Sequence, residues 1–251
     1  MSFVRDGYEI IVLEGEALEW AESGASRLRR AVGELTTLHG REVTVARHAE
    51  LARMASIYPR LVITSLLSYF RTLIGADLHI QQEPFLRISR PGIPDDNIGL
   101  HRDTWYGDTP YEISVWIPFT DTDEGNALRV APGSHLWSEE AYPIERFDGG
   151  VEKGSVKHSL GFIHSQPKRY VTPPETIALP VRVGEMIVFS LALLHGMEVN
   201  RSKRTRVSMD VRLANSLAPV KFSRSRDANY YEQLCVSPVT EAARRYYEAQ
   251  K

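Results

Sequence analysis

Residues 206–213, RVSMDVRL, alternate strictly between polar and apolar side chains. Because neighbouring side chains of a β-strand point to opposite faces, this segment is predicted to be a strand with two dense and different faces. Two interpretations stay open. A surface strand would show the same alternation, whereas in a closed or sandwiched β architecture the polar face lines a cavity and could bind a ligand. That face carries Arg206, Ser208, Asp210 and Arg212.

The rest of the chain divides into a helical first third and a β-rich remainder. Apolar residues three and four apart predict a helix within residues 16–35, a second over 46–57, and a third that begins at Pro59 and ends before Gly75. Alternation from about residue 78 onward predicts strands, with a polar, Gly- and Pro-rich insertion at 136–179. We therefore expect one domain, with helical support (1–77), a β core (78–215) and a C-terminal helical tail (216–251).

Composition narrows the possible partners. The chain has 251 residues, 43% of them hydrophobic, which is ample for a large core. Its net charge of −2 and scattered basic residues argue against nucleic-acid binding. The single cysteine excludes an intrachain disulfide and indicates a reducing compartment. Its N-terminus lacks a signal-peptide pattern, and its longest apolar stretch is too short to span a membrane, so we expect a cytoplasmic protein. The oligomeric state stays open.

Two His-x-acid pairs are candidates for a metal site: His48 with Glu50, and His101 with Asp103. The first pair lies in a predicted helix, where residues two apart point about 200° away from each other and cannot bind one ion. The second pair follows β-favouring sequence and a turn, and residues two apart on extended chain share a face. Only His101 and Asp103 are therefore plausible joint ligands.

A non-haem iron site of the two-histidine, one-carboxylate type needs a further histidine. His195 ends the strand-like run 184–196 and precedes Gly196, so it could present an imidazole at a pocket mouth. A histidine that caps a strand and bonds to the backbone is the alternative at this position. The other candidates are His39, His79, His135, His158 and His164.

The order His101-x-Asp103, His195 and then Arg206 resembles the Fe(II)/2-oxoglutarate-dependent dioxygenases, in particular their phytanoyl-CoA hydroxylase-like branch. The resemblance covers about residues 80–215 and includes the segment HRDTWYGDTPYEISVWIPFTDTDEGNALRVAPGSH at 101–135. It implies a mainly β fold with packed helices: a double-stranded β-helix (a cupin-like jelly roll) with an N-terminal helical layer. It also implies that His101, Asp103 and His195 are the catalytic iron ligands, with O2 as the oxidant.

The same resemblance implies a 2-oxoglutarate site. Arg206 would bind the distal carboxylate, for which a planar and permanently charged guanidinium is well suited. Ser208 could add a hydrogen bond, and Trp116 matches a position where the family packs an aromatic ring against the cosubstrate. The alternatives are a solvated surface charge at Arg206 and a purely structural Trp116. Arg204 and Arg87 are the rivals of Arg206 for binding the cosubstrate. The candidates for contact with the substrate are Arg87, Trp105 and Tyr106.

The implied activity is hydroxylation of a small polar metabolite, with release of succinate and CO2. Desaturation, epoxidation and cyclisation are further outcomes of the same chemistry. The chain is similar to family members that act in antibiotic or surface-sugar biosynthesis. Two alternatives are a zinc hydrolase with the same three ligands, for which we identify no adjacent general base, and an inactive jelly-roll binding protein. Basic residues of the insertion could form a cationic lid or a solvated loop: Lys153, Lys157, His158, Lys168 and Arg169.

Overall fold

A computed structural model describes residues 2–40, 45–97, 99–106, 108–146, 168–218 and 230–250. Helices fill most of the N-terminal part, as predicted, but the third predicted helix divides at Leu66 into two. A strand that we did not predict, β1 (Tyr8–Val12), precedes the long helices. The helical elements are α1 (Ser2–Asp6), α2 (Gly15–Val32), the 3-10 turn Leu35–Gly40, α3 (Val45–Met54), α4 (Arg60–Ser65) and α5 (Leu67–Ile74).

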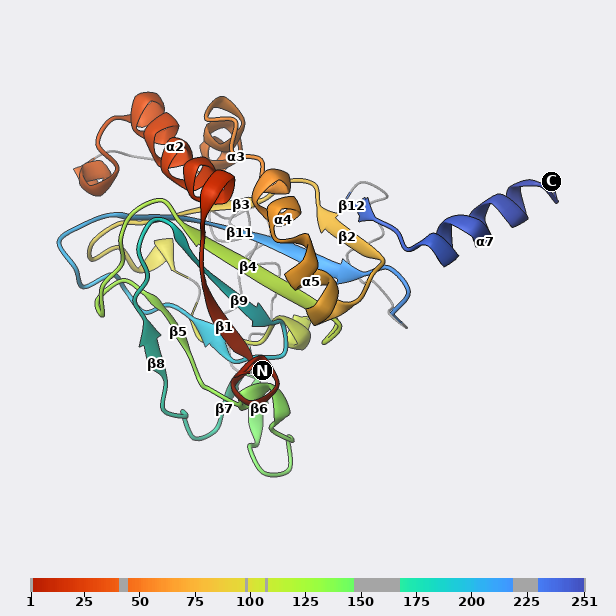
Figure 1. Cartoon of the computed structure of the whole chain (residues 1–251). Coiled ribbons are helices and arrows are strands. Elements are labelled where there is room, and N and C mark those ends of the chain that lie inside the picture. Colours follow the sequence, from red (N-terminus) through yellow and green to blue (C-terminus); the bar gives the residue numbers. More distant parts are fainter. Residues whose placement is uncertain are drawn as a thin grey trace.

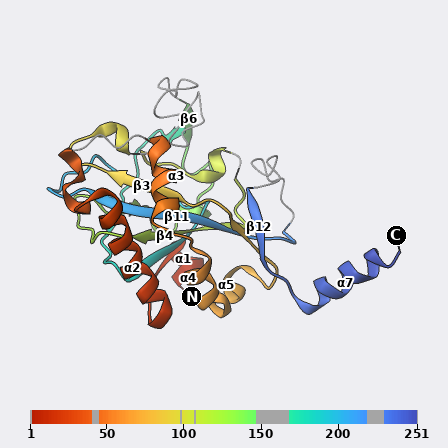
Figure 2. The same ribbon diagram turned by 90° about the horizontal axis from the view of Figure 1, so that it is seen from above.

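A seven-stranded antiparallel sheet forms the centre of the molecule, and the N-terminal helices cover one of its faces (Figures 1 and 2). The strand order is β1-β9-β4-β11-β2-β12, and β3 pairs with β11 beside β2. The six strands besides β1 are β2 (Leu78–Gln81), β3 (Phe85–Ser89), β4 (Glu112–Pro118), β9 (Glu185–Ser190), β11 (Arg206–Asn215) and β12 (Tyr231–Cys235).

A smaller sheet with the order β10-β5-β8 completes the jelly roll. Its strands are β5 (Leu128–Val130), β8 (Ile177–Leu179) and β10 (His195–Gly196). The predicted single run 184–196 is wrong in one respect: residues 191–194 lie between β9 of the large sheet and β10 of the small one. The predicted insertion is also too long, because β8 belongs to the core.

The insertion contributes a two-stranded pair, β6 (Ile144–Arg146) with β7 (Lys168–Tyr170). Lys168 and Arg169 lie on β7, while the other three basic residues of the predicted lid lie outside the described residues, as does His164.

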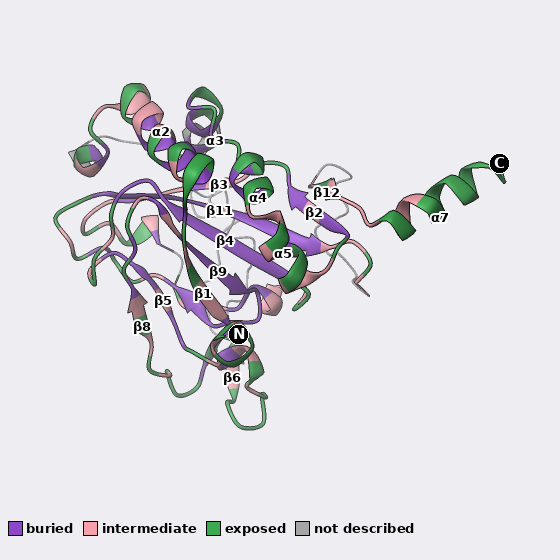
Figure 3. Cartoon of the chain, in the orientation of Figure 1, coloured by how far each residue is buried: buried purple, intermediate pink, exposed green. Residues whose placement is uncertain are grey.

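The two faces of β11 are both buried, which decides between the two interpretations of its alternation (Figure 3). Its apolar side chains pack with those of the helices in the main core. Its polar side chains are on the opposite face, which the large sheet shares with Trp116, Ile187 and Phe189. Those three pack against Leu128, Val130 and Leu179 of the small sheet. The polar face therefore lines the interior of the jelly roll.

The C-terminal part differs from the predicted helical tail. It begins with β12, which pairs with β2, and then forms α7 (Pro238–Glu248). The hydroxyl of Ser237 caps this helix by accepting a hydrogen bond from the backbone N–H of Thr240. Helix α7 extends away from the sheets and has no buried residue (Figure 1). Within the described part of the chain, no helix has the length and apolarity that a membrane span requires.

Candidate metal centre and cosubstrate pocket

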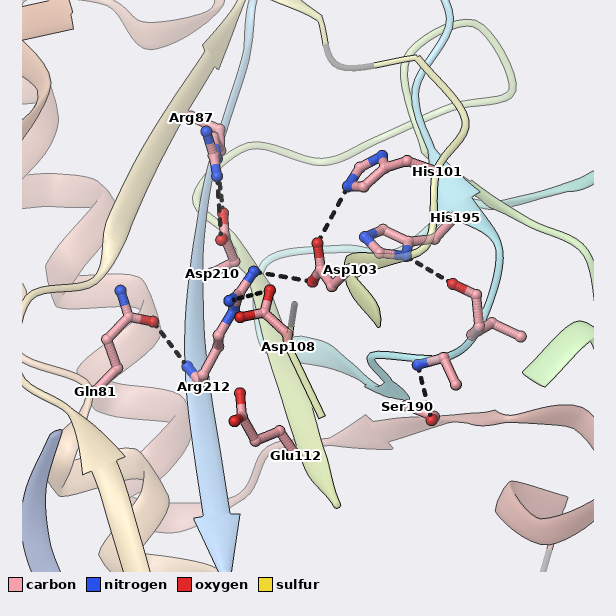
Figure 4. Close-up of polar contacts among 12 residues, drawn as sticks. Gln81, Arg87, His101, Asp103, Asp108, Glu112, Ser190, His195, Asp210 and Arg212 are labelled. Carbon is pink, nitrogen blue, oxygen red and sulfur yellow. Dashed lines mark hydrogen bonds and ion pairs between the residues drawn. The ribbon is translucent and has the colours of Figure 1, made fainter. Parts of the chain in front are cut away.

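His101 and His195 are joined through their backbones. The N–H of His101 donates to the carbonyl of His195 (2.8 Å) and the N–H of His195 donates to that of His101 (2.9 Å). This antiparallel bridge places the two imidazoles side by side, with ring centroids 4.4 Å apart (Figure 4). Gly196 permits the close approach, because a Cβ there would lie 2.6 Å from the carbonyl oxygen of Gly99.

The backbone also orients both imidazole rings. The Nδ1 atom of His101 lies 2.8 Å from the carbonyl oxygen of Gly99, and that of His195 lies 2.9 Å from the carbonyl oxygen of Leu193. Since a carbonyl only accepts hydrogen bonds, each Nδ1 carries the hydrogen and each Nε2 keeps its lone pair for a metal. The hydrogen bond of His195 to the backbone, which was the alternative interpretation of this residue, is therefore compatible with a role as a metal ligand.

Asp103 adds a carboxylate to the two histidines. It lies on the 3-10 turn Asp103–Tyr106, and its Oδ1 is 3.3 Å from Nε2 of His101. The potential ligand atoms of His101, Asp103 and His195 all lie within 4.8 Å of one another. Two imidazoles and one carboxylate, nearly enclosed by protein, are a donor set that suits Fe(II) or Zn(II).

The protonation states suit metal binding. Burial alone would raise the pKa of Asp103, but the Arg212 guanidinium holds that pKa well below its usual range. Arg212 donates from Nη2 to Oδ2 of Asp103 (3.0 Å). Burial, and then the neighbouring His101, lower the pKa of His195 to about 4. The site therefore holds an ionised carboxylate and a neutral imidazole at neutral pH, which are the forms that coordinate metals.

A second buried site lies on β11 of the large sheet. Arg206 is 0% exposed, and its guanidinium carbon lies 5.6 Å from the centre of the Trp116 ring. Its Nη1 contacts the sulfur of Met197 and the carbonyl oxygen of Asn126. Among the described residues, no partner bonds to Nε or Nη2 of Arg206 or to the hydroxyl of Ser208.

Buried polar atoms without partners are rare in folded proteins, because desolvation without a hydrogen bond is costly. Burial, and then repulsion from Arg87, lower the pKa of Arg206 to about 9, so the guanidinium is still charged at neutral pH. Its free donors and the Ser208 hydroxyl fit an oxygen-rich anion such as a carboxylate. Arg204, the predicted rival, is exposed and precedes β11.

The predicted substrate residues lie around the metal centre but have partners of their own. Arg87 donates to Asp210 from Nε (2.8 Å) and Nη2 (3.4 Å). The ring of Tyr106 lies beside that of His101, with 6.3 Å between centroids. Trp105 packs edge-on against Tyr170, at 5.3 Å between centroids, in a small aromatic cluster.

Sequence reasoning missed Glu112 as a functional candidate, although it shares the polar face of its strand with Ser114 and Trp116. It is 3% exposed, and the hydroxyl of Tyr231 donates to it over 2.9 Å. Burial, opposed by that hydrogen bond and assisted by the charge of Asp108, raises the pKa of Glu112 to about 7. An acid that titrates near neutrality, close to a metal centre, is a candidate for proton transfer or substrate binding.

The family of the chain follows from comparison with known proteins. A model of the phytanoyl-CoA dioxygenase (PhyH) family matches residues 4–208. The chain belongs to this family. The PhyH match covers the helical layer and most of the jelly roll, including all three metal-ligand candidates and Arg206. Fe(II)- and 2-oxoglutarate-dependent dioxygenases are therefore its relatives.

One characterised dioxygenase shows a distant similarity to the chain. The dioxygenase olcK of Penicillium canescens is 27% identical over 123 residues, which are 45% of this chain and 32% of that protein. The chain thus spans only about a third of that relative.

Solved structures share the fold at low identity. AviO1 from Streptomyces viridochromogenes Tue57 is 20% identical, with 87% of this chain and 94% of that chain covered and a TM-score of 0.54. EctD from S. alaskensis, solved with 2-oxoglutarate and 5-hydroxyectoine, is 18% identical, with 88% and 76% covered and a TM-score of 0.53. SnoK, an alpha-ketoglutarate-dependent carbocyclase from nogalamycin biosynthesis, is 18% identical, with 94% and 90% covered and a TM-score of 0.52.

Proposed function

We propose that this protein is a non-haem Fe(II)- and 2-oxoglutarate-dependent oxygenase that hydroxylates a small polar metabolite. The observation that carries the proposal is the fully buried guanidinium of Arg206, whose Nε and Nη2 have no partner among the described residues, on the sheet that lines the same interior as the metal-ligand triad. A triad alone suits several metals and reactions. An interior arginine with free donors adds a specific place for an organic acid.

Each residue of the site has a task in this proposal. His101, Asp103 and His195 hold the iron, with both imidazoles oriented by their backbone hydrogen bonds. Arg206 binds the distal carboxylate of 2-oxoglutarate through Nε and Nη2, and Ser208 donates to it as well. Trp116, which is 3% exposed, packs beside this carboxylate and keeps water away. When bound, the iron and 2-oxoglutarate supply the oxidising chemistry, in which O2 is consumed and succinate and CO2 are released.

The substrate side of the interior is polar. Arg87, Asp210 and Glu112 lie on strands of the large sheet near the triad (Figure 4). The ring of Tyr106 lies beside that of His101. An interior lined by these polar side chains favours a substrate with hydroxyl, amino or carboxylate groups over a hydrocarbon. We place Trp105 near the rim of the same pocket.

The pathway and the exact reaction are extrapolated from relatives and from chemistry. SnoK is a carbocyclase from nogalamycin biosynthesis, and EctD was solved with 5-hydroxyectoine. These two relatives in fold support a biosynthetic role on a small molecule, for example in antibiotic or surface-sugar biosynthesis. Desaturation, epoxidation and cyclisation stay open as outcomes. The single cysteine supports a reducing, cytoplasmic location.

Zinc-dependent hydrolysis is the second candidate, because Glu112 provides the kind of base that our sequence analysis did not find beside the ligands. A hydrolase of this type has no use for a buried arginine with free donors, so Arg206 favours the oxygenase. An inactive binding protein is disfavoured because all three metal ligands are present and suitably oriented.

Metal substitution separates the two enzyme classes. With Fe(II), 2-oxoglutarate and air, we expect the protein to form succinate slowly even without its primary substrate, and to form none with Zn(II) or without oxygen. Succinate is measured by mass spectrometry after each incubation. A protein that forms no succinate with Fe(II), but cleaves ester or amide substrates with Zn(II), would overturn the proposal.

A further inference from the structure

The carboxylate of Asp103 has two oxygens with different partners. Oδ1 faces His101 at 3.3 Å and lies in the cluster of potential metal ligands. Oδ2 accepts a hydrogen bond from Nη2 of Arg212 at 3.0 Å. A carboxylate that is held through one oxygen presents the other in a fixed direction, whereas a free carboxylate rotates about its terminal torsion.

Arg212 is itself held at both ends. Its backbone N–H, on β11, donates to the side-chain oxygen of Gln81 on the neighbouring strand β2. Its Nη1 donates to Oδ2 of Asp108 over 2.8 Å. The side chains of Arg212 and Asp108 are only 7% and 4% exposed. One guanidinium thus bridges two carboxylates and ties the segment that carries Asp103 to the central sheet (Figure 4).

The charge arrangement explains why the bridge is built from an arginine. Two buried carboxylates repel each other, and a planar guanidinium with separate donors can bind both at once, which an ammonium group does less well. Removing one partner of a buried ion pair leaves an uncompensated charge, so the three groups are expected to act as a unit.

We propose that Arg212, fixed by Asp108, is a positioning residue that aims the Asp103 carboxylate at the metal and thereby sets the metal affinity. This inference rests on the proposed function, because it takes Asp103 as a ligand. Residues that orient metal ligands in this way change metal affinity by about 10- to 100-fold when they are replaced.

Mn(II) is a suitable probe, because it binds oxygen and imidazole ligands without reacting with air on the timescale of a titration. Its affinity for the metal-free full-length chain is measured by EPR or calorimetry. We expect Arg212→Gln to weaken Mn(II) binding by about 10- to 100-fold. Arg212→Lys keeps the charge but binds one carboxylate at a time, so its Mn(II) affinity should lie between those of the wild type and of Arg212→Gln.

A matched control is Arg90→Gln. Arg90 also forms a partly buried ion pair, with Asp96 at 2.8 Å, but neither residue belongs to the metal cluster. Thermal unfolding of each variant, with and without Mn(II), separates the two possible roles. A purely structural Arg212 would lower the unfolding temperature without changing the increment that Mn(II) adds, whereas a positioning Arg212 reduces that increment.

The outcomes are distinct. Folded Arg212→Gln with wild-type Mn(II) affinity would overturn the inference and leave the proposed function intact. If Arg212→Gln does not fold, Arg212→Lys decides: weaker Mn(II) binding than in Arg90→Gln supports the inference, and equal binding overturns it. Failure of the wild-type chain to bind Mn(II) or Fe(II) would instead overturn the metal centre itself.

Discussion

Arg206→Gln is expected to lower the affinity for 2-oxoglutarate by about 100-fold while the metal still binds. The reason is that Nε and Nη2 of Arg206 have no partner among the described residues, so a bound carboxylate would take both. A hydrogen bond to a charged group contributes about 1.5 kcal/mol or more, and two such bonds correspond to roughly two orders of magnitude in affinity. The affinity is measured anaerobically by calorimetry on Mn(II)-loaded protein.

Two variants control for this result. Arg206→Lys retains a positive charge without the planar fork, so we expect it to recover only part of the affinity. Arg204→Gln removes an exposed arginine two residues away and should leave the affinity unchanged. If Arg206→Gln binds 2-oxoglutarate normally, the cosubstrate site lies elsewhere, and Arg87 becomes the next candidate. Thermal unfolding confirms that each variant is folded.

His101→Ala and Asp103→Ala should abolish metal binding and succinate formation together. Each substitution removes one of the three proposed protein ligands, and we expect the affinity for Fe(II) or Mn(II) to fall by more than 100-fold, beyond the effect of replacing residues that merely orient ligands. Asp103→Ala carries a second cost, because it leaves the buried guanidinium of Arg212 with Asp108 as its remaining hydrogen-bonded carboxylate.

His79→Ala is the control for these two variants, because His79 is a half-buried histidine on β2 that does not belong to the metal cluster. It should bind metal as the wild type does. Metal content is measured after reconstitution and desalting, and succinate in the same samples. If His101→Ala or Asp103→Ala still binds metal or still forms succinate, the replaced residue is not a ligand of the metal centre.

Local periodicity was enough to predict much of the fold. The apolar residues of the α2 region, three and four apart, predicted a helix, and α2 buries Ala21, Ala25 and Leu28 while Leu18 and Val32 are half-buried. The alternation in β11 predicted two faces, and the structure shows that both are buried. His48 lies in a helix, as predicted, while the potential ligand atoms of His101 and Asp103 lie close together although Asp103 begins a 3-10 turn and does not continue extended chain. These features depend on residues that are close together in the sequence, and the spacing of apolar and polar residues is enough to predict them.

Features that depend on distant contacts could not be predicted. Residues 191–194, which carry the chain from one sheet to the other, are as apolar as the strand before them, so the run looked continuous. The short strands β1 and β12 are defined by their pairing with β9 and β2. Likewise, the alternation of polar and apolar residues in β11 predicted Arg212 on the polar face, but only the fold shows that Arg212 binds Asp103 and Asp108.

The most direct test of the central claim is an anaerobic absorption spectrum, because it requires no knowledge of the substrate. The claim is that one interior holds Fe(II) on His101, Asp103 and His195 and binds 2-oxoglutarate through Arg206. Addition of 2-oxoglutarate to the Fe(II)-loaded protein should produce a weak visible charge-transfer band that is absent with Zn(II). A chain that binds Fe(II) but shows no such band at saturating 2-oxoglutarate would contradict the claim.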